Sequence, residues 1–185
     1  MELFRVFVWD GSSLDDREGG PLFVLRSHQG KGRHDNPSRY GAWYCSRLPV
    51  AAVAESIQRF RGQTLQDRDL SRPDGRTTAM AKLDLPADVS IADLDDPGVL
   101  SERGLRPSQV ATRRRSITQP IAESLFADGA DGLSWWSTLE GEWINVTLFH
   151  ERVVRRVTLS EPPRRLSIRL PEVRQAAEHL GIVLA

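Results

Sequence analysis

The sequence has 185 residues, which is enough for one folded domain with a buried core. Its 25 Lys and Arg residues balance 25 Asp and Glu residues, so no net charge attracts nucleic acid or an anionic membrane. The hydrophobic content of 39% excludes general disorder, and the single cysteine, Cys45, excludes a disulfide framework. No apolar run approaches the ~20 residues that cross a bilayer and no signal peptide is indicated, so we expect a cytoplasmic protein.

The first part of the chain predicts strands separated by loops. Apolar residues predict a buried strand over 3–9 and a short second strand over 21–25. Aromatic residues predict a further strand over 41–45. The intervening segments 10–20 and 27–38 are polar and contain glycine, which is typical of loops.

A helix is predicted to begin at Pro49, a position where the missing N–H costs nothing. Its apolar residues recur at helical spacing and form one stripe: Val50, Val53, Ile57 and Phe60. Glu55 falls nearly opposite this stripe, and the small side chains of Ala51 and Ala52 leave a shallow slot beside it. Glu55 is therefore either a solvated carboxylate or, where another layer covers that face, a carboxylate that points into a cleft.

The rest of the chain continues with a polar segment over 63–76 and then mixes strands with helices. The predicted elements are, in order, strands over 77–85 and 89–94, a helical or irregular segment over 107–115, a helix over 121–127 with Pro120 in its first turn, strands over 132–136, 143–149 and 153–159, and a helix over 171–180. Strands at both ends with helices between them predict an α+β fold and not a regular βαβ repeat.

Two arginines are candidates for anion binding. Arg33 follows Gly32, and a guanidinium beside a glycine can bind a diphosphate through two parallel hydrogen bonds. The alternative is a loop arginine that forms a surface ion pair. Arg5 lies inside an apolar strand, where an unpaired charge is costly. It must point to a rim, find a carboxylate or face a ligand, and the alternative is an edge-strand arginine.

A second polar and aromatic cluster follows the turn signal at 131–132. Trp135 and Trp136 are interpreted as core residues in preference to a ligand platform. Ser137, at the end of the predicted strand, can reach a ribose or a catalytic acid. Asn145 on the next strand can support the same pocket.

Other chemistries are not indicated. No G-x-S-x-G elbow surrounds Ser134 or Ser137, and the four histidines have no metal-binding spacing, so we expect neither a nucleophilic serine nor a metal site. The basic run 113–115 is interpreted as a solvated face, so no nucleic-acid partner is expected.

In their order along the chain, these residues resemble the RES domain family, named for its arginine, glutamate and serine. The motifs that carry the resemblance are Phe4-Arg5, Gly32-Arg33-x-x-Asn36-Pro37, Trp43-Tyr44 before the helix that bears Glu55, Asp131-Gly132-Leu133 leading to Trp136-Ser137, and Asn145-x-x-Leu148-Phe149. The family's usual Gly-Gly-Arg-Trp-Asn-Pro is altered here by one extra residue and by His34 in place of tryptophan. The resemblance implies a RES domain over 1–160 and a C-terminal helical extension over 161–185 packed on the same domain.

The resemblance implies an ADP-ribosyltransferase-like fold, with a mixed β core and flanking helices, and the toxin of a bacterial toxin–antitoxin pair. NAD⁺ is implied as a substrate and not a cofactor, cleaved at the nicotinamide–ribose bond by hydrolysis or phosphorolysis. The implied partner is a cognate Xre-type antitoxin that covers the active site. A homodimer and a hetero-oligomer with the antitoxin are the expected assemblies, and no membrane partner is expected.

The residues that match the family by position are Glu55, Arg33 and Ser137 as catalytic residues, and Arg5, Arg33, Tyr44 and Asn145 as NAD⁺-binding residues. In these roles Glu55 stabilises positive charge on the ribose. Arg33 and Arg5 hold the diphosphate, Tyr44 offers its π face to nicotinamide, and Ser137 bonds a ribose hydroxyl or steadies the glutamate.

Two alternatives stay open at this level. A protein ADP-ribosyltransferase toxin would use the same residues and pass the ADP-ribose to a cellular protein. A non-catalytic nucleotide-binding or interaction domain would keep the residues without turnover, and a change such as His34 is of the kind that accompanies loss of activity.

Overall fold

The chain folds into two compact units that interleave along the sequence, as the computed structural model of residues 1–185 shows. The first unit comprises Met1 with residues 24–45 and 85–157, and the second comprises residues 2–23, 46–84 and 158–185. Both units therefore combine segments that lie far apart in the sequence. The expected boundary at residue 160 stays a prediction.

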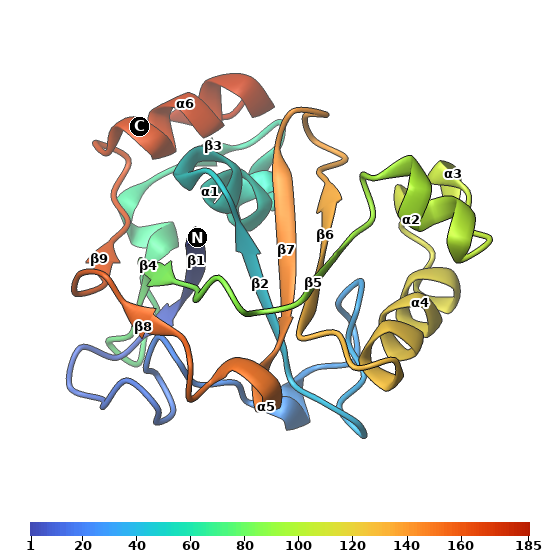
Figure 1. Ribbon diagram of the computed structural model, residues 1–185. Helices are drawn as coiled ribbons and strands as arrows, with labels where there is room; N and C mark the ends of the chain where they lie inside the picture. Colours follow the sequence, from blue (N-terminus) through green and yellow to red (C-terminus); the bar gives the residue numbers. More distant parts are fainter. The chain divides into compact units, whose positions relative to one another are not determined.

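The first unit contains a mixed sheet with helices (Figure 1). Its strands lie in the order β5 (Ile91–Asp93), β6 (Gly132–Trp136), β7 (Ile144–Phe149) and β2 (Ala42–Ser46), whose last residue belongs to the second unit. β5 runs parallel to β6, and β6 runs antiparallel to β7. The helices are η1 (Arg26–His28), α2 (Pro97–Glu102), α3 (Pro107–Val110), α4 (Arg115–Ala127) and α5 (His150–Val153).

The core of the first unit is aromatic and aliphatic. Its members include Tyr40, Leu125, Leu133 and Phe149, each with no exposed surface. Tyr40 and Phe149 pack edge to face with ring centroids 4.5 Å apart, an arrangement that aromatic quadrupoles favour. Burial of this cluster fixes β6 and β7 against α4.

The second unit pairs its strands around β4 (Thr77–Asp84). β1 (Glu2–Trp9) is antiparallel to β4 along its whole length, and β8 (Thr158–Leu159) and β9 (Arg164–Arg165) pair with β4 as well. A separate parallel pair joins β3 (Thr64–Leu65) to β10 (Val183–Leu184). The helices are α1 (Pro49–Ile57), η2 (Gln58–Phe60), η3 (Asp67–Leu70) and α6 (Pro171–Leu180).

Helix α1 is enclosed more completely than a single apolar stripe predicts. Four successive residues, 51–54, are buried, and together they cover every side of one helical turn. α1 packs against both α6 and β1, and its small alanines allow this close approach. Because a helix that is apolar all round is a buried helix, burial in α1 extends beyond the predicted stripe, which includes only Val53 of these four residues.

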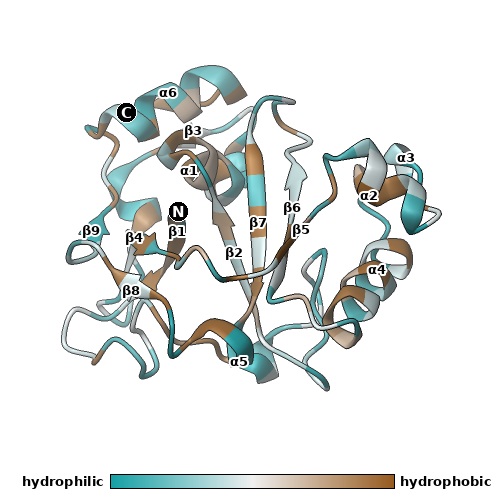
Figure 2. Cartoon of the chain, in the orientation of Figure 1, coloured by the Kyte–Doolittle hydropathy of each residue, from teal (hydrophilic) through white to brown (hydrophobic).

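Helix α6 shows the simpler amphipathic pattern. In Figure 2 hydrophobic and hydrophilic residues alternate along α6, and its buried residues include Val173, Ala176, Ala177 and Leu180. The helix ends at Gly181, whose φ of 67° lies in the left-handed region that glycine adopts without strain.

Three predicted elements differ in the structure. Residues 21–25 form turns and irregular backbone in place of a strand, because the Arg5 guanidinium, and no neighbouring strand, binds the carbonyl oxygens of Pro21 and Phe23. Residues 153–159 are mostly helical turn, since the Val157 N–H donates to Val153 O, and the strand is limited to β8. α4 begins at Arg115, so Pro120 lies inside the helix and not in its first turn.

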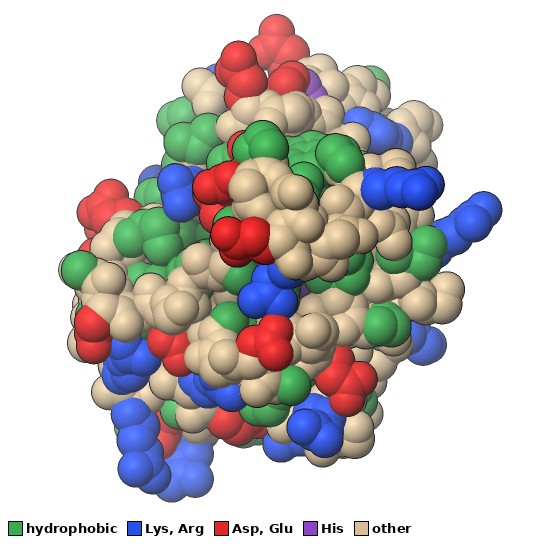
Figure 3. Space-filling model, turned by 45° about the vertical axis from the view of Figure 1, so that its right-hand side comes forward, with side chains coloured by type: hydrophobic (Ala, Val, Ile, Leu, Met, Phe, Trp, Pro, Cys, Tyr) green, Lys and Arg blue, Asp and Glu red, His purple; other side chains and the backbone are tan.

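Charge and hydropathy fit the balanced composition. Figure 3 shows basic and acidic side chains interspersed over the face in view. No helix has both the length and the apolar character that a bilayer span requires.

Candidate functional site

The six predicted site residues fall into two groups. Arg33, Tyr44, Ser137 and Asn145 belong to the first unit, and Arg5 and Glu55 belong to the second.

Arg33 lies in a loop that a buried carboxylate organises. Asp35, which is 5% exposed, accepts hydrogen bonds from the backbone N–H groups of Gly30 (2.7 Å) and Gly32 (2.6 Å) through Oδ2. Its Oδ1 accepts a third hydrogen bond, 2.7 Å long, from the Tyr44 hydroxyl. The same hydroxyl accepts from the N–H of His34 at 2.9 Å. One carboxylate and one phenol on β2 therefore fix the backbone on both sides of Arg33.

Burial raises the pKa of the Tyr44 hydroxyl, and the negative charge of Asp35 raises it further. The hydroxyl thus stays protonated at neutral pH and remains a donor to Asp35. The prediction that the Tyr44 ring offers a face to nicotinamide remains a prediction, but its hydroxyl has a structural role that the sequence did not reveal.

Gly32 is required by this arrangement. A Cβ at this position would collide with Oη of Tyr44 and with Oδ1 of Asp35, the two atoms whose hydrogen bond organises the loop. The glycine therefore allows close approach of protein atoms to the loop, in addition to any approach of a ligand.

The loop is also attached to the helices of the first unit. The Arg33 Nη1 donates to the carbonyl oxygens of Val110 (3.0 Å) and Thr112, while the Thr118 hydroxyl donates to the Arg33 carbonyl. Gln119 donates through Nε2 to the carbonyl oxygen of Gly32 at 3.0 Å. Arg33 is thus half-buried, with its guanidinium bound to two main-chain carbonyl oxygens.

His34 is a buried neutral side chain. It is 2% exposed, its Nδ1 lies 2.8 Å from the Thr147 hydroxyl, and its ring meets Trp135 edge to face at 4.6 Å. Burial, together with the positive charge of Arg33, lowers the pKa of His34 to about 3. The ring therefore packs as an uncharged aromatic next to the arginine, where the family typically has tryptophan.

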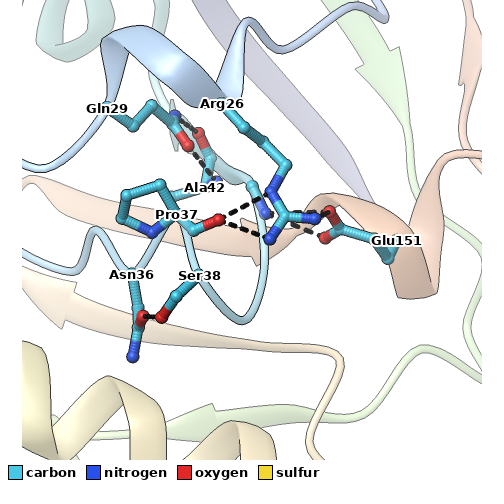
Figure 4. Close-up of polar contacts among 8 residues, drawn as sticks. Arg26, Gln29, Asn36, Pro37, Ser38, Ala42 and Glu151 are labelled. Carbon is cyan, nitrogen blue, oxygen red and sulfur yellow. Dashed lines mark hydrogen bonds and ion pairs between the residues drawn. The ribbon is translucent and has the colours of Figure 1, made fainter.

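The segment after Arg33 is fixed by a second set of polar contacts (Figure 4). Arg26 donates from Nε and Nη2 to the carbonyl oxygen of Pro37 and forms an ion pair with Glu151 (3.0 Å). The Glu151 carboxylate also accepts from the N–H of Gly41, at 2.9 Å for Oε2. Gln29 exchanges two hydrogen bonds with the backbone of Ala42, of 2.7 and 2.9 Å. These contacts tie the loop to β2 and α5.

Ser137 and Asn145 are deeply buried, with 2% and 3% of their surface exposed. The Ser137 N–H donates to the carbonyl oxygen of Trp143 (2.6 Å), and its Oγ accepts from the N–H of Leu139 (3.0 Å). Asn145 pairs with Trp135 across β6 and β7, and Trp135 is 4% exposed, which confirms its interpretation as a core residue. The Ser137 hydroxyl thus caps the turn after β6.

In the second unit, Glu55 is half-buried on the enclosed helix α1. Its Oε2 accepts a hydrogen bond of 2.8 Å from Nε2 of Gln58, one turn later. Arg5, also half-buried, donates to the carbonyl oxygens of Pro21 and Phe23 (3.0 Å for the latter). Its strand, β1, pairs along its whole length with β4 and, on its other side, pairs with β2 at Phe4 and Ser46. The edge-strand alternative for Arg5 is therefore wrong, because β1 has pairing partners on both sides.

The residues that sequence reasoning missed are Asp35, Thr118 and Thr147. Asp35 had a detectable signal, since an aspartate shortly after two glycines commonly accepts hydrogen bonds from backbone N–H groups of a turn. The two threonines lie on distant elements and gave no local signal. No group of three His, Cys, Asp or Glu side chains is placed to hold a metal ion.

We predict that Gly32→Ala lowers stability by about 1–3 kcal/mol, the usual cost of overpacking, because the new methyl displaces Tyr44 or Asp35. Urea unfolding monitored by tryptophan fluorescence measures the change. Gly141→Ala is the matched control, since a Cβ at Gly141 meets no atom within 4 Å. Equal stability of the two variants would contradict the role of Gly32.

We predict that His34 makes the free energy of unfolding decrease as the pH falls. An unfolded histidine has a pKa of about 6.5, and the folded value is about 3. The stability that neutral His34 contributes is therefore present above pH 6.5 and lost as the pH falls toward 3, by up to about 1.4 kcal/mol per pH unit.

Unfolding free energies of the wild type and His34→Gln measured between pH 7.5 and 4.5 test this expectation. The variant should lose less stability with falling pH, whereas His28→Gln, at an exposed position, should follow the wild type. Identical slopes for the wild type and His34→Gln would show that His34 does not contribute.

A chain in the crystal structure of the M. tuberculosis MbcT–MbcA toxin–antitoxin complex is similar in fold, with a TM-score of 0.63 and 16% identity over 97% of this chain and 88% of that chain. This match confirms the expected ADP-ribosyltransferase-like α+β fold. No curated protein sequence matches significantly. The RES domain model matches residues 12–169, a range that contains every predicted site residue except Arg5, and the chain therefore belongs to the RES domain family.

Proposed function

We propose that this protein is the toxin of a toxin–antitoxin pair and that it degrades NAD⁺ by cleaving the nicotinamide–ribose bond. The observation that carries the proposal is membership of the RES domain family together with Arg33, Glu55 and Ser137 in the family's order. The expected cytoplasmic location is part of the same proposal.

In the proposed reaction, the bond between C1″ of the nicotinamide ribose and the nicotinamide nitrogen breaks, and its electron pair leaves with nicotinamide. The sugar then carries positive charge, as in the oxocarbenium-like transition state of glycoside hydrolysis. The Glu55 carboxylate is assigned to stabilise this charge. Water, or phosphate in a phosphorolysis, adds its oxygen to C1″, and in hydrolysis the released proton goes to solvent. Nicotinamide leaves as a neutral molecule, so no strong general acid is required.

The geometry of the first unit supports the role given to Arg33. Diphosphate binding needs a guanidinium that is held in place, because a fixed cation orders its ligand without further loss of side-chain entropy. The hydrogen bonds of Asp35, Tyr44 and Thr118 to the loop provide such a position. Arg5 is proposed to assist at the diphosphate.

The burial of Ser137 and Asn145 is consistent with the proposal that they shape an NAD⁺-binding site. Both side chains lie in or next to β6 and β7, whose packing fixes their positions. We assign Ser137 to a ribose hydroxyl or to the support of Glu55, and Asn145 to the nucleotide. Tyr44 is proposed to stack on nicotinamide while its hydroxyl stays bonded to Asp35.

We predict that the purified protein releases nicotinamide from NAD⁺ and that Glu55→Gln lowers kcat about a hundredfold or more, as loss of electrostatic stabilisation does elsewhere. Glu178→Gln, at an exposed position of α6, is the matched control and should keep full activity. Chromatographic quantification of nicotinamide provides the measurement. Full turnover by Glu55→Gln would remove Glu55 from the mechanism.

The fate of ADP-ribose in the same assay identifies the acceptor. With NAD⁺ labelled in the adenosine, hydrolysis leaves the label in ADP-ribose and phosphorolysis leaves it in ADP-ribose-1″-phosphate. Label on a protein band identifies a protein ADP-ribosyltransferase instead. Binding of NAD⁺ by calorimetry without any turnover would identify a non-catalytic nucleotide-binding domain.

We further propose an Xre-type antitoxin as the partner, a proposal supported by the fold shared with a chain of a toxin–antitoxin complex. Expression of the wild type in a bacterial host should arrest growth and deplete NAD⁺, and expression of Glu55→Gln should do neither. Where a neighbouring gene encodes a small helix-turn-helix protein, co-expression of that protein should restore growth, and the protein should co-purify with both forms. Growth arrest by Glu55→Gln equal to the wild type would contradict toxicity through NAD⁺.

A further inference from the structure

The second unit contains a pocket of about 340 Å³ that none of the proposed catalytic residues lines. Three stretches of chain form its wall. They are β1 with Val6, Phe7 and Val8, the end of α1 with Ser56 followed by η2 with Arg59, and the segment from η3 to β4 with Asp69, Ser71, Arg72 and Thr78. These elements can be found in Figure 1 around β1 and β4. The volume falls in the range of pockets that bind small molecules.

Two arginines make the pocket basic. Arg59 and Arg72 are both exposed, and neither forms a salt bridge. The acidic residue closest in sequence to Arg72, Asp74, is instead paired with Arg76 at 2.7 Å. The Arg59 guanidinium lies 4.9 Å from the centroid of the Phe60 ring, a cation–π contact that restricts its position. The pocket thus offers two guanidinium groups that can form charge-assisted hydrogen bonds to an anion.

Three hydroxyl groups and one carboxylate complete the polar lining. Ser56, Ser71 and Thr78 can each donate a hydrogen bond. The Asp69 carboxylate is held at the start of η3, where its Oδ2 accepts from the Gln66 N–H at 2.9 Å. An ionised carboxylate is an acceptor only, so a ligand beside Asp69 needs a hydrogen to donate.

We propose that this pocket binds a phosphate group, either as inorganic phosphate or as the phosphate of a nucleotide. Inorganic phosphate at pH 7 keeps at least one hydrogen for Asp69, while its remaining oxygens accept from Arg59, Arg72 and the hydroxyls. A nucleotide monophosphate has a second pKa of about 6, so it keeps this hydrogen at pH 7 only in its monoanionic form. Sulfate has the same shape but no hydrogen, so Asp69 disfavours it. The volume exceeds that of a bare phosphate ion and leaves room for the organic part of a phosphomonoester beside Val6 and Val8.

The test of this site does not depend on the proposed NAD⁺ cleavage, because phosphate binding is measured without NAD⁺ and at residues outside the proposed mechanism. We expect inorganic phosphate, titrated into the full chain at pH 7 in a phosphate-free buffer, to shift the backbone amide signals of Ser71 and Arg72 in NMR spectra. Arg59→Gln and Arg72→Gln should each weaken this binding at least tenfold. Arg174→Gln, at an exposed position of α6, should leave it unchanged.

Sulfate and nucleotide titrations sharpen the test. Wild type should bind phosphate at least tenfold more tightly than sulfate, and Asp69→Asn, which keeps an acceptor oxygen and adds N–H donors, should reduce that preference. Tighter binding of AMP than of phosphate identifies a nucleotide as the source of the group, and equal or weaker binding of AMP identifies inorganic phosphate. Absence of any shift at Ser71 and Arg72, unchanged binding in both arginine variants, or adenosine binding as tightly as AMP would overturn the proposal.

Discussion

The carboxylate of Asp35 is the interaction on which the arginine loop depends. It is buried, and it accepts hydrogen bonds from two backbone N–H groups and one phenol. Protein donors therefore offset the cost of burying this carboxylate. Because Tyr44 belongs to β2, the loop takes its position from the sheet of the first unit. The need for Gly32 follows from this carboxylate and its bond to Tyr44. The same carboxylate adds to the effect of burial in keeping Tyr44 protonated, and it helps to fix the loop that carries Arg33.

A different constraint governs the second unit. Glu55 lies on a helix whose residues 51–54 are all buried, and the alanines at 51, 52 and 54 make that possible. Larger side chains there would separate α1 from α6 and β1. The carboxylate therefore depends on small residues that have no chemistry of their own, in the same way that Arg33 depends on a glycine.

Part of this could be predicted from the sequence and part could not. Long periodic segments such as β1, β4, α1 and α6 follow from their apolar patterns, and the family follows from the order of Arg33, Glu55 and Ser137. The apolar pattern of residues 21–25 predicts a strand, and this prediction is wrong. Carbonyl oxygens of the segment bind a distant guanidinium, which no local pattern reveals. The contact of His34 with Thr147 joins residues more than a hundred positions apart, and only the fold brings them together.

Because the two units interleave along the sequence, the second unit cannot be completed early in synthesis on the ribosome. Residues 158–185 belong to the second unit, and α6 is the helix that covers α1. During synthesis, the helix that carries Glu55 therefore stays without this cover until α6 has emerged, and contacts of such long sequence separation form slowly. For a protein proposed to consume a metabolite of its own host, the second unit is thus incomplete while all the residues between α1 and α6 are being made.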